Sequence, residues 1–325
     1  MKKNIALVTG GFSGEAVISY KSAATIDKNL DRLKFNVYLI DINKEGWFYQ
    51  VSNEGKIEID KNDFSLNLKN EKIKFDAVFI GMHGTPGEDG KLQGYFDLLK
   101  IPYTGCNATT SAITFNKRYT VAVAAMGGIH VAKSMHLFKH TTVLISQICD
   151  QLKFPVFVKP SNGGSSIGMS KISKTEDLES AIAKAFLEDD QVLIEEMIVG
   201  REFTVGVFKS NETIIVLPIT EVKSKKDFFD FEAKYLGASE EITPADIEVV
   251  VAEKIRTAAK NIYAIFNCNG IVRIDFIYHE ASGNPFMLEI NSIPGQSDAS
   301  LVPMQVKEMG WSLKEFYSKL LEACF

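Results

Sequence analysis

The sequence predicts an α/β domain with a parallel sheet at the N-terminus, in a chain long enough for two or three domains. Residues 4–9 form a short β pattern that ends in Gly10-Gly11, and a helical pattern follows from about residue 15 to residue 33. Further strand patterns lie at residues 35–42 and 75–82. Strands that alternate with helices are typical of a parallel sheet, and 325 residues exceed the size of one small domain.

The composition is that of an ordinary globular protein and argues against several functional classes. Hydrophobic residues make up 46% of the chain and charged residues 24%. A net charge of -5 and a pI near 5.7 argue against a nucleic-acid partner, which would require a basic surface. No stretch approaches the roughly 18 to 20 apolar residues of a membrane span, so we also expect no membrane segment. The four cysteines are far apart and form no CxxC, which favours reduced thiols in a cytoplasmic protein.

Two glycine-containing turns follow strands of the predicted N-terminal sheet. Gly10-Gly11 leads into a helix, and such a turn places N–H groups and the positive end of the helix near a ligand. The dinucleotide fingerprint GxGxxG is absent, so no nicotinamide cofactor is expected. The segment HGTPGEDGKLQG at residues 83–94 follows the strand at 75–82, where open α/β sheets place ligands. Its ionisable residues His83, Glu88 and Asp89 favour a functional loop over a long flexible turn.

A lysine and a glycine-rich loop between two strands indicate phosphate binding. Residues 154–160, FPVFVKP, deliver Lys159 to the loop SNGGSS at residues 161–166, and an extended pattern resumes at residues 167–172. The P-loop motif places its lysine after the glycines, at the start of a helix, and is therefore excluded. The N–H groups of this loop could close over a nucleotide as a lid, and a plain hairpin turn is the alternative.

Among the segments between these motifs and the C-terminus, one is predicted from its own sequence to be a functional loop. Residues 223–245 are polar and irregular, include Tyr235, and are long enough to be a functional loop. Thr243-Pro244 is predicted to cap a helix with an apolar stripe, and Ser312-x-x-Glu315 reads as a capping box. The other predicted elements are helices at residues 107–126, which include Lys117, and 175–187, and strands at residues 191–197, from Glu202 onward and at 214–222.

The segment 272–295 is predicted to be a hairpin that carries acidic residues on one face. Alternation places Arg273 and Asp275 on one face of the first strand, and Glu289 and Asn291 on one face of the second. The apolar residues Ile274, Phe276, Leu288 and Ile290 take the other faces. Asp275 then lies opposite Glu289, and two like charges across a ladder favour a bound cation. Oxygen ligands without histidine or thiolate favour Mg²⁺ or Mn²⁺, and solvated acids on an exposed hairpin are the alternative.

Taken together, these motifs resemble the ATP-grasp ligases and, within them, the D-alanine:D-alanine ligase family. The matching segments follow in the family's order: GGFSGE, HGTPGEDGKLQG, IPYTG, KPSNGGSSIGMSKI, EFTVGV, EAKY, RIDF, LEINSIPG and SLVPM. The resemblance implies a Rossmann-like parallel-sheet domain at residues 1–100 followed by an ATP-grasp fold of two α+β subdomains. These would be a central lid subdomain at residues 101–196 and a C-terminal catalytic subdomain at residues 197–325.

The resemblance also implies a role for individual residues. The residues implied to bind ATP are Lys117, Lys159, Ser161, Gly164, Ser165, Ser166, Glu195, Glu196, Met197, Ile198, Glu202 and Lys234. Those implied to ligate two Mg²⁺ or Mn²⁺ ions are Asp275, Glu289 and Asn291. Those implied to be catalytic are Glu15, Ser165, Tyr235, Arg273 and Gly295, and those implied to bind the two D-alanine substrates are Glu15, His83, Ser300 and Leu301.

By this resemblance, the expected activity is ATP-dependent joining of two D-alanines for peptidoglycan precursors, in a cytoplasmic homodimer. A ligase that joins D-alanine to D-lactate is one alternative, against which Tyr235 argues, and a non-catalytic ATP-binding regulator is another. Three positions depart from the commoner family pattern. Asn116 replaces an aspartate, Ala16 replaces a polar or charged residue, and residues 296–300, QSDAS, lack a histidine often found before the serine.

Overall fold

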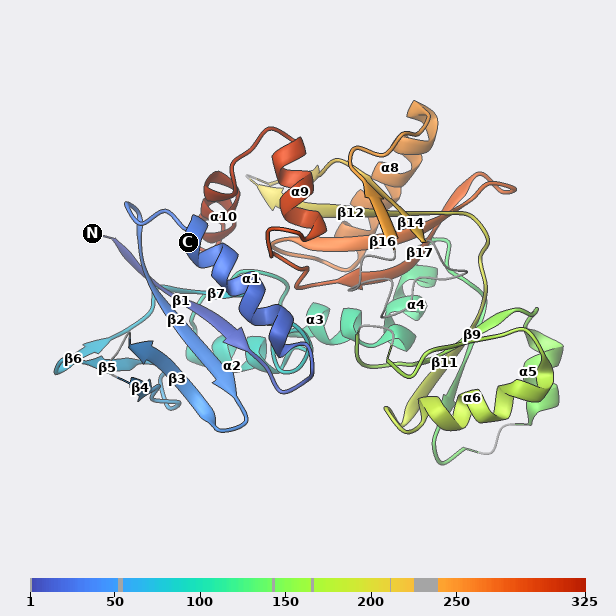
Figure 1. The fold of residues 1–325 in the computed structure, drawn as a ribbon, viewed down its shortest axis with the longest axis horizontal. Coiled ribbons are helices and arrows are strands. Elements are labelled where there is room, and N and C mark those ends of the chain that lie inside the picture. Colours follow the sequence, from blue (N-terminus) through green and yellow to red (C-terminus); the bar gives the residue numbers. More distant parts are fainter. Residues whose placement is uncertain (1, 52–54, 142–143, 165–166, 211, 225–238) are drawn as a thin grey trace.

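The computed structural model describes residues 2–51, 55–141, 144–164, 167–210, 212–224 and 239–325. Three sheets dominate these residues (Figure 1). The N-terminal sheet is blue in Figure 1, the central sheet is green, and the C-terminal sheet is yellow to red.

The N-terminal sheet has the strand order β4-β3-β2-β1-β7. Strand β1 pairs in parallel with β2 and with β7, which confirms the predicted parallel arrangement of those three strands. Two further strands extend this sheet and pair antiparallel, β3 with β2 and β4 with β3. Only Lys44 and Glu45 separate β2 from β3, and so short a connection permits only an antiparallel hairpin. The elements of this part are β1 (Lys3–Gly10), α1 (Ala16–Asn29), β2 (Phe35–Asn43), β3 (Gly46–Val51), β4 (Gly55–Glu58), β5 (Leu66–Leu68), β6 (Glu71–Ile73), β7 (Ala77–Ile80) and α2 (Lys91–Leu99).

The central part is an antiparallel sheet with the order β10-β9-β11-β8, covered by two helices that share its apolar core. The helical span predicted at 107–126 is two helices, because Asn116 adopts an extended backbone between them and its side chain caps the second. The elements are α3 (Ala108–Phe115), α4 (Lys117–Met126), β8 (Ser134–Phe138), α5 (Ile145–Gln151), β9 (Val156–Pro160), β10 (Ser170–Ile172), the 3₁₀ turn η1 (Thr175–Asp177), α6 (Leu178–Ala185) and β11 (Gln191–Glu196).

The C-terminal sheet has the order β15-β14-β12-β16-β17, and β13 also pairs with β12. Its helix α8 begins at Val249, so the prediction that Thr243-Pro244 caps it was wrong. The Thr243 hydroxyl instead hydrogen-bonds to the Thr220 hydroxyl of β14 at 2.6 Å. The elements are β12 (Arg201–Ser210), β13 (Thr213–Val216), β14 (Thr220–Ser224), β15 (Ser239–Ile242), α8 (Val249–Ile265), β16 (Val272–His279), β17 (Asn284–Asn291), α9 (Leu301–Glu308) and α10 (Leu313–Glu322).

The acidic hairpin is β16 and β17, with Asp275 paired opposite Glu289 as predicted. One apolar residue does not follow the predicted alternation. The register shifts after Asp275, so that Phe276 pairs with Met287, and Leu288 is the extra residue of a β-bulge. Leu288 lines both cavities described below, whereas Phe276 stays in the core. Ile290 is buried in that core and also lines the second cavity.

The chain's last two helices return to the N-terminal domain. One buried cluster joins β1 and α1 to Phe208 of β12 and to α9 and α10. Phe316 of α10 is fully buried and makes an edge-to-face contact with Phe208, with 5.3 Å between ring centroids. The N-terminal and C-terminal sheets therefore share one core.

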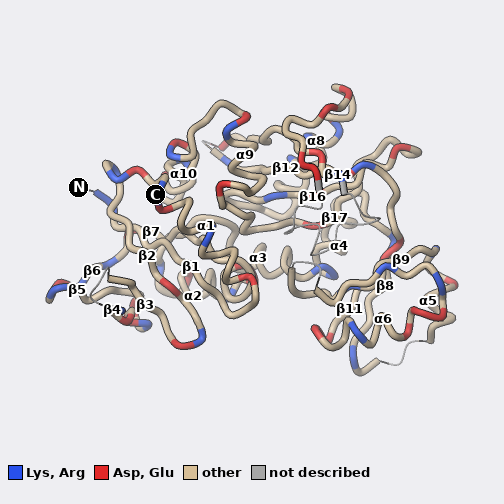
Figure 2. Tube along the Cα trace, in the orientation of Figure 1, with Lys and Arg blue, Asp and Glu red and all other residues tan. Residues whose placement is uncertain are grey.

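In the described ranges, no helix is both long and apolar enough to cross a bilayer. Figure 2 shows lysine and arginine interspersed with aspartate and glutamate along the trace.

The shared core predicts a cost for losing the Phe316 ring. Phe316→Ala should lower the free energy of unfolding by about 3–5 kcal/mol, since it leaves a cavity among buried side chains. Leu98→Ala, on a side chain that is 85% exposed, should change it by less than about 0.5 kcal/mol. Denaturant unfolding of both variants measures this, and equal effects would contradict a core shared by the two sheets.

Candidate active site

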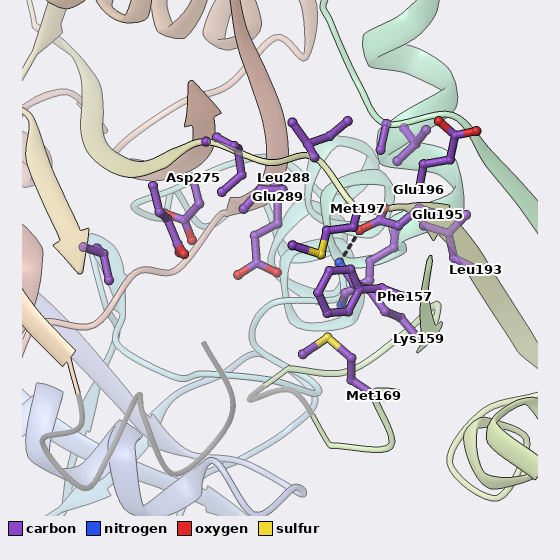
Figure 3. A pocket seen from close by; sticks show the side chains of 18 of the residues that line it. Phe157, Lys159, Met169, Leu193, Glu195, Glu196, Met197, Asp275, Leu288 and Glu289 are labelled. Atoms are coloured by element: carbon purple, nitrogen blue, oxygen red, sulfur yellow. Dashed lines mark hydrogen bonds and ion pairs between the residues drawn. The ribbon is translucent and has the colours of Figure 1, made fainter. Parts of the chain in front are cut away.

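Two cavities meet at the acidic hairpin. The first, of about 500 Å³, lies between the central and C-terminal sheets (Figure 3). The second, of about 350 Å³, lies between the N-terminal domain and the end of the hairpin. Both are lined by Lys117, Gly163, Gly164, Leu288 and Glu289. A ligand in the first cavity can therefore place one end against a ligand in the second.

The first cavity has an apolar slot closed by a buried ion pair. Phe157, Met169 and Met197 line the slot, which suits a flat aromatic ring (Figure 3). Beside them, the Lys159 ammonium donates to the Glu195 carboxylate from the neighbouring strand β11. Glu195 is therefore placed as the partner of Lys159.

Several other residues predicted to bind ATP lie on the segment that follows Glu195. The Glu196 carboxylate points out of the slot and accepts from the Lys153 amide at 2.9 Å. The Met197 amide donates to the Pro155 carbonyl at 2.9 Å, so that N–H group is already engaged. Ile198 and Glu202 line the cavity wall.

A second ion pair in this cavity was missed by the sequence analysis. Arg201 and Glu221 lie on the neighbouring strands β12 and β14, and their side chains form a bidentate pair with distances of 2.8 and 2.9 Å. The Arg201 guanidinium lowers the pKa of Glu221, whose side chain is buried. Both residues line the cavity next to Glu202. The sequence showed the strand patterns near Arg201 and Glu221, but it did not show that β12 pairs with β14.

Lys117 is placed at the junction of the two cavities. Its ammonium donates to the Gly163 carbonyl at 2.9 Å, and its backbone amide donates to the Ser161 carbonyl at 2.8 Å. The Ser161 hydroxyl is fully buried without a hydrogen-bond partner among the described residues, and Ser161 does not line the cavity. Ser161 thus contributes through its backbone.

The acidic face of the hairpin carries a mixed network of charges and oxygen donors. Arg273 forms a bidentate pair with Asp275, with both distances 2.9 Å, and the Thr204 hydroxyl also donates to Asp275. The Asn291 amide nitrogen donates to Asp275 at 3.2 Å. Glu289 faces the same space from the opposite strand (Figure 3).

This donor set fits hard divalent cations. Its potential ligands are oxygens, from the carboxylates of Asp275 and Glu289 and the amide of Asn291, as Mg²⁺ or Mn²⁺ require. In the described part of the chain, no three His, Cys, Asp or Glu residues cluster as a metal site, because the third ligand here is an amide. Two carboxylates directly opposite each other also favour a cation between them.

The carboxylate of Glu15 marks the start of the second cavity. Glu15 is the N-cap residue of α1, and its carboxylate lies close to two glycines, Gly84 and Gly164. A Cβ at Gly84, whose φ is +66°, would lie 2.6 Å from one Glu15 oxygen, and a Cβ at Gly164 would lie 2.5 Å from the other. Glu15 is therefore in contact with both the N-terminal loop and the glycine loop of the central subdomain.

His83 and Ser22 tie the N-terminal domain to the segment after the hairpin. The His83 ring hydrogen-bonds to the Ser22 hydroxyl at 2.9 Å, and that hydroxyl accepts from the Gln296 amide at 3.1 Å. Burial, together with the nearby Arg273 cation, lowers the pKa of His83 to about 4. The ring is therefore neutral at physiological pH.

Glu88 lines the same cavity and was not among the predicted site residues. It accepts from the Gly84 amide at 3.0 Å and from the Ile293 amide at 3.4 Å. Burial raises its pKa to about 7, with a further contribution from the negative charges of Glu15 and Glu289. Its place in the loop HGTPGEDGKLQG was the signal that could have identified it.

The far end of the second cavity is formed by the start of α9. Ser300 is the residue before this helix, and its hydroxyl hydrogen-bonds to that of Ser297 at 2.7 Å. Leu301 and Gly295 line the cavity beside it. The start of a helix offers backbone N–H groups to a carboxylate.

Most of the predicted site residues thus meet at these two cavities. Four others, Ser165, Ser166, Lys234 and Tyr235, lie outside the described residues.

Known families match nearly the whole chain. Residues 4–106 match the family model described as D-ala D-ala ligase N-terminus, and residues 120–322 match D-ala D-ala ligase C-terminus. The D-alanine--D-alanine ligase of Phocaeicola vulgatus is 42% identical over 326 residues, covering 100% of both chains. That of Parabacteroides distasonis is 42% identical over 322 residues, covering 99% of this chain and 97% of the relative.

Solved structures agree in fold over the same length. The VanG D-Ala:D-Ser ligase from Enterococcus faecalis has a TM-score of 0.90 at 30% identity, covering 100% of both chains. The D-alanyl-alanine synthetase A from Vibrio cholerae has a TM-score of 0.87 at 29% identity, covering 99% of this chain and 98% of that one.

The lowered pKa of His83 predicts a specific acid sensitivity. Below pH about 6.5 the unfolded chain takes up a proton at this residue that the native state does not, so stability falls as the pH drops toward 4. The loss should reach about 3 kcal/mol by pH 4, and His83→Gln should abolish that part of the pH dependence. Denaturant unfolding between pH 7 and pH 4 measures this, with the exposed His140→Gln as control. A His83→Gln profile parallel to the wild type would contradict the buried neutral ring.

Proposed function

The chain belongs to the D-alanine:D-alanine ligase family, and from that premise we propose how its two joined cavities carry out the reaction. The enzyme joins two D-alanines to D-alanyl-D-alanine with ATP, through an acyl phosphate, for peptidoglycan precursors. The main observation behind this proposal is that the two cavities adjoin, since Lys117 and Glu289 line both cavities. The nucleotide would occupy the first cavity and the two amino acids the second.

The first step brings two anions together, the γ-phosphate and the carboxylate of the first D-alanine. Lys159 and Lys117 would neutralise the phosphates, since one ammonium lies beside the apolar slot and the other at the junction. Catalysis of phosphoryl transfer consists largely of such positioning and charge stabilisation. The Glu195 carboxylate would hold Lys159 in place for this role.

Two Mg²⁺ or Mn²⁺ ions would be held by Asp275, Glu289 and Asn291. When bound, they would neutralise charge on the phosphates and on the transferred group. The pairing of Arg273 with Asp275 keeps the guanidinium on the same face of the hairpin.

The second step joins the amine of the second D-alanine to the acyl carbon of the first. Glu15 would bind the ammonium group of the first D-alanine, beside neutral His83, and thereby fix its orientation. The amide of Gly295 and the guanidinium of Arg273 would stabilise the tetrahedral oxyanion. Holding the two substrates side by side can supply about 7–11 kcal/mol of the barrier reduction.

The second substrate's carboxylate would bind at Ser300 and Leu301, where α9 begins. Ser165 and Tyr235 would complete a hydrogen-bonded network with Glu15, and Ser166 and Lys234 would contact ATP. We propose the domain limits 1–100, 101–196 and 197–325, a homodimer, and a cytoplasmic location. The four cysteines are free thiols, which supports that location.

A coupled ADP-release assay tests the function directly. ADP release should require D-alanine, and the product should be the dipeptide. D-Serine and D-lactate, each offered together with D-alanine, measure how narrow the second site is, because a structural neighbour is a D-Ala:D-Ser ligase. Nucleotide binding without turnover on any of these acids would identify a regulator instead of a ligase.

Glu289→Gln tests the metal assignment. It removes one negative charge where we place the divalent ions, so kcat/KM for ATP should fall by about a hundredfold or more. Glu280→Gln makes the same chemical change at an exposed position of the same hairpin and should have little effect. Steady-state kinetics over a range of Mg²⁺ concentrations measures both, and near-normal ligation by Glu289→Gln would refute the metal site.

A further inference from the structure

We propose that Asn116, Asn162 and Asp189 form a directional hydrogen-bond chain that positions the glycine loop beneath the nucleotide phosphates. The proposal rests on the proposed function, since it assigns positioning residues to the ATP site. Asn116 separates α3 from α4, Asn162 is the second residue of the glycine loop, and Asp189 precedes β11. These three residues therefore link three segments of the central subdomain by hydrogen bonds.

The direction of the first link is set by helix capping. The Asn116 side-chain oxygen accepts from the Tyr119 amide at 3.3 Å, as an N-cap residue does. Its nitrogen is therefore turned outward, and it donates to the Asn162 side-chain oxygen at 3.0 Å and to the Gln191 side-chain oxygen at 3.4 Å.

The direction of the second link is set by the carboxylate. One oxygen of Asp189 accepts both from the Asn162 side-chain nitrogen at 2.9 Å and from the Asn162 backbone amide at 2.6 Å. The other oxygen accepts from the Gln191 amide at 3.2 Å. Asn162 must present its nitrogen to Asp189, and so its oxygen must face Asn116.

Backbone hydrogen bonds connect the same segments to a predicted phosphate ligand. The Ser161 amide donates to the Gln191 carbonyl at 2.9 Å, and the Ser161 carbonyl accepts from the Lys117 amide at 2.8 Å. The Lys117 ammonium donates to the Gly163 carbonyl at 2.9 Å. A shift of Asn162 would therefore move Gly163 relative to Lys117.

This geometry explains why position 116 carries an amide where the family commonly has aspartate. An aspartate at 116 could still cap α4, but its second oxygen would face the Asn162 oxygen. If the Asn162 amide turned by about 180°, its oxygen would no longer face residue 116 but would face the Asp189 carboxylate, and two oxygens would again repel each other. Asn116 is only 5% exposed, so water could not relieve the repulsion.

The test is Asn116→Asp, read by nucleotide binding. Isothermal titration of ADP with Mg²⁺, without D-alanine, should show at least about tenfold weaker binding, while KM for D-alanine changes less than about twofold. Asn107→Asp is the matched control, because Asn107 caps α3 in the same way and accepts from the Thr110 amide. It should leave nucleotide affinity unchanged. Equal affinities for Asn116→Asp and the wild type would overturn the proposal.

A double-mutant cycle shows whether Asn116 acts through Asn162. In an Asn162→Ala background the repelling oxygen is gone, so adding Asn116→Asp should weaken ADP binding by less than about twofold. If Asn116→Asp lowers ADP affinity about tenfold in both backgrounds, Asn116 does not act through Asn162 and the proposal is wrong. A wild-type protein that binds ADP but makes no dipeptide would refute the proposed ligase activity and leave this measurement valid.

Discussion

The crowding of carboxylates around the joined cavities is the constraint on which the site depends. Asp275 and Glu289 lie directly opposite each other, and Glu15 and Glu88 line the adjoining cavity. Arg273 forms a bidentate pair with Asp275. The rise of the Glu88 pKa to about 7 reflects this crowding, since after burial its main cause is the charge of Glu15. Cations would relieve this repulsion, and in the proposed reaction they are the substrate ammonium groups and the metal ions.

The same crowding requires that the elements around the site are held in fixed positions. The ion pairs of the site lie within single sheets, such as Arg273 with Asp275 on β16 and Lys159 with Glu195 on β9 and β11, so other contacts must hold the sheets against one another. Backbone amides carry much of this fixation: Glu88 accepts from Ile293, and Ser22 accepts from Gln296. Because both links join the N-terminal domain to the segment just after the hairpin, they also fix the Gly295 amide between them. The core shared by the N-terminal sheet and the last helices supports the same junction.

The sequence predicted those parts of the site that depend on local periodicity. The pairing of Asp275 with Glu289 followed from alternation and loop length, and it is the observed register. Alternation failed at Leu288, because a bulge inserts one residue and no sequence period marks a bulge. The pairing of Lys159 with Glu195 was not predicted, since it depends on β9 and β11 being neighbours. Interactions between strands distant in sequence are fixed by tertiary packing. A sequence motif identifies only one residue of such a pair and not its partner.

The end of the cavity at α9 shows how a departure from the family pattern can be accommodated. Ala299, the residue before Ser300, lines the cavity there and offers no ring to orient a carboxylate. The hydroxyls of Ser297 and Ser300 hydrogen-bond to each other, which occupies one of their two protons and leaves the other for a ligand. Lys21 also lines this cavity, but it is exposed and its charge is screened by solvent. At the proposed site, binding of the second substrate's carboxylate would depend on one hydroxyl and the N–H groups at the start of α9, and so on geometry more than on charge.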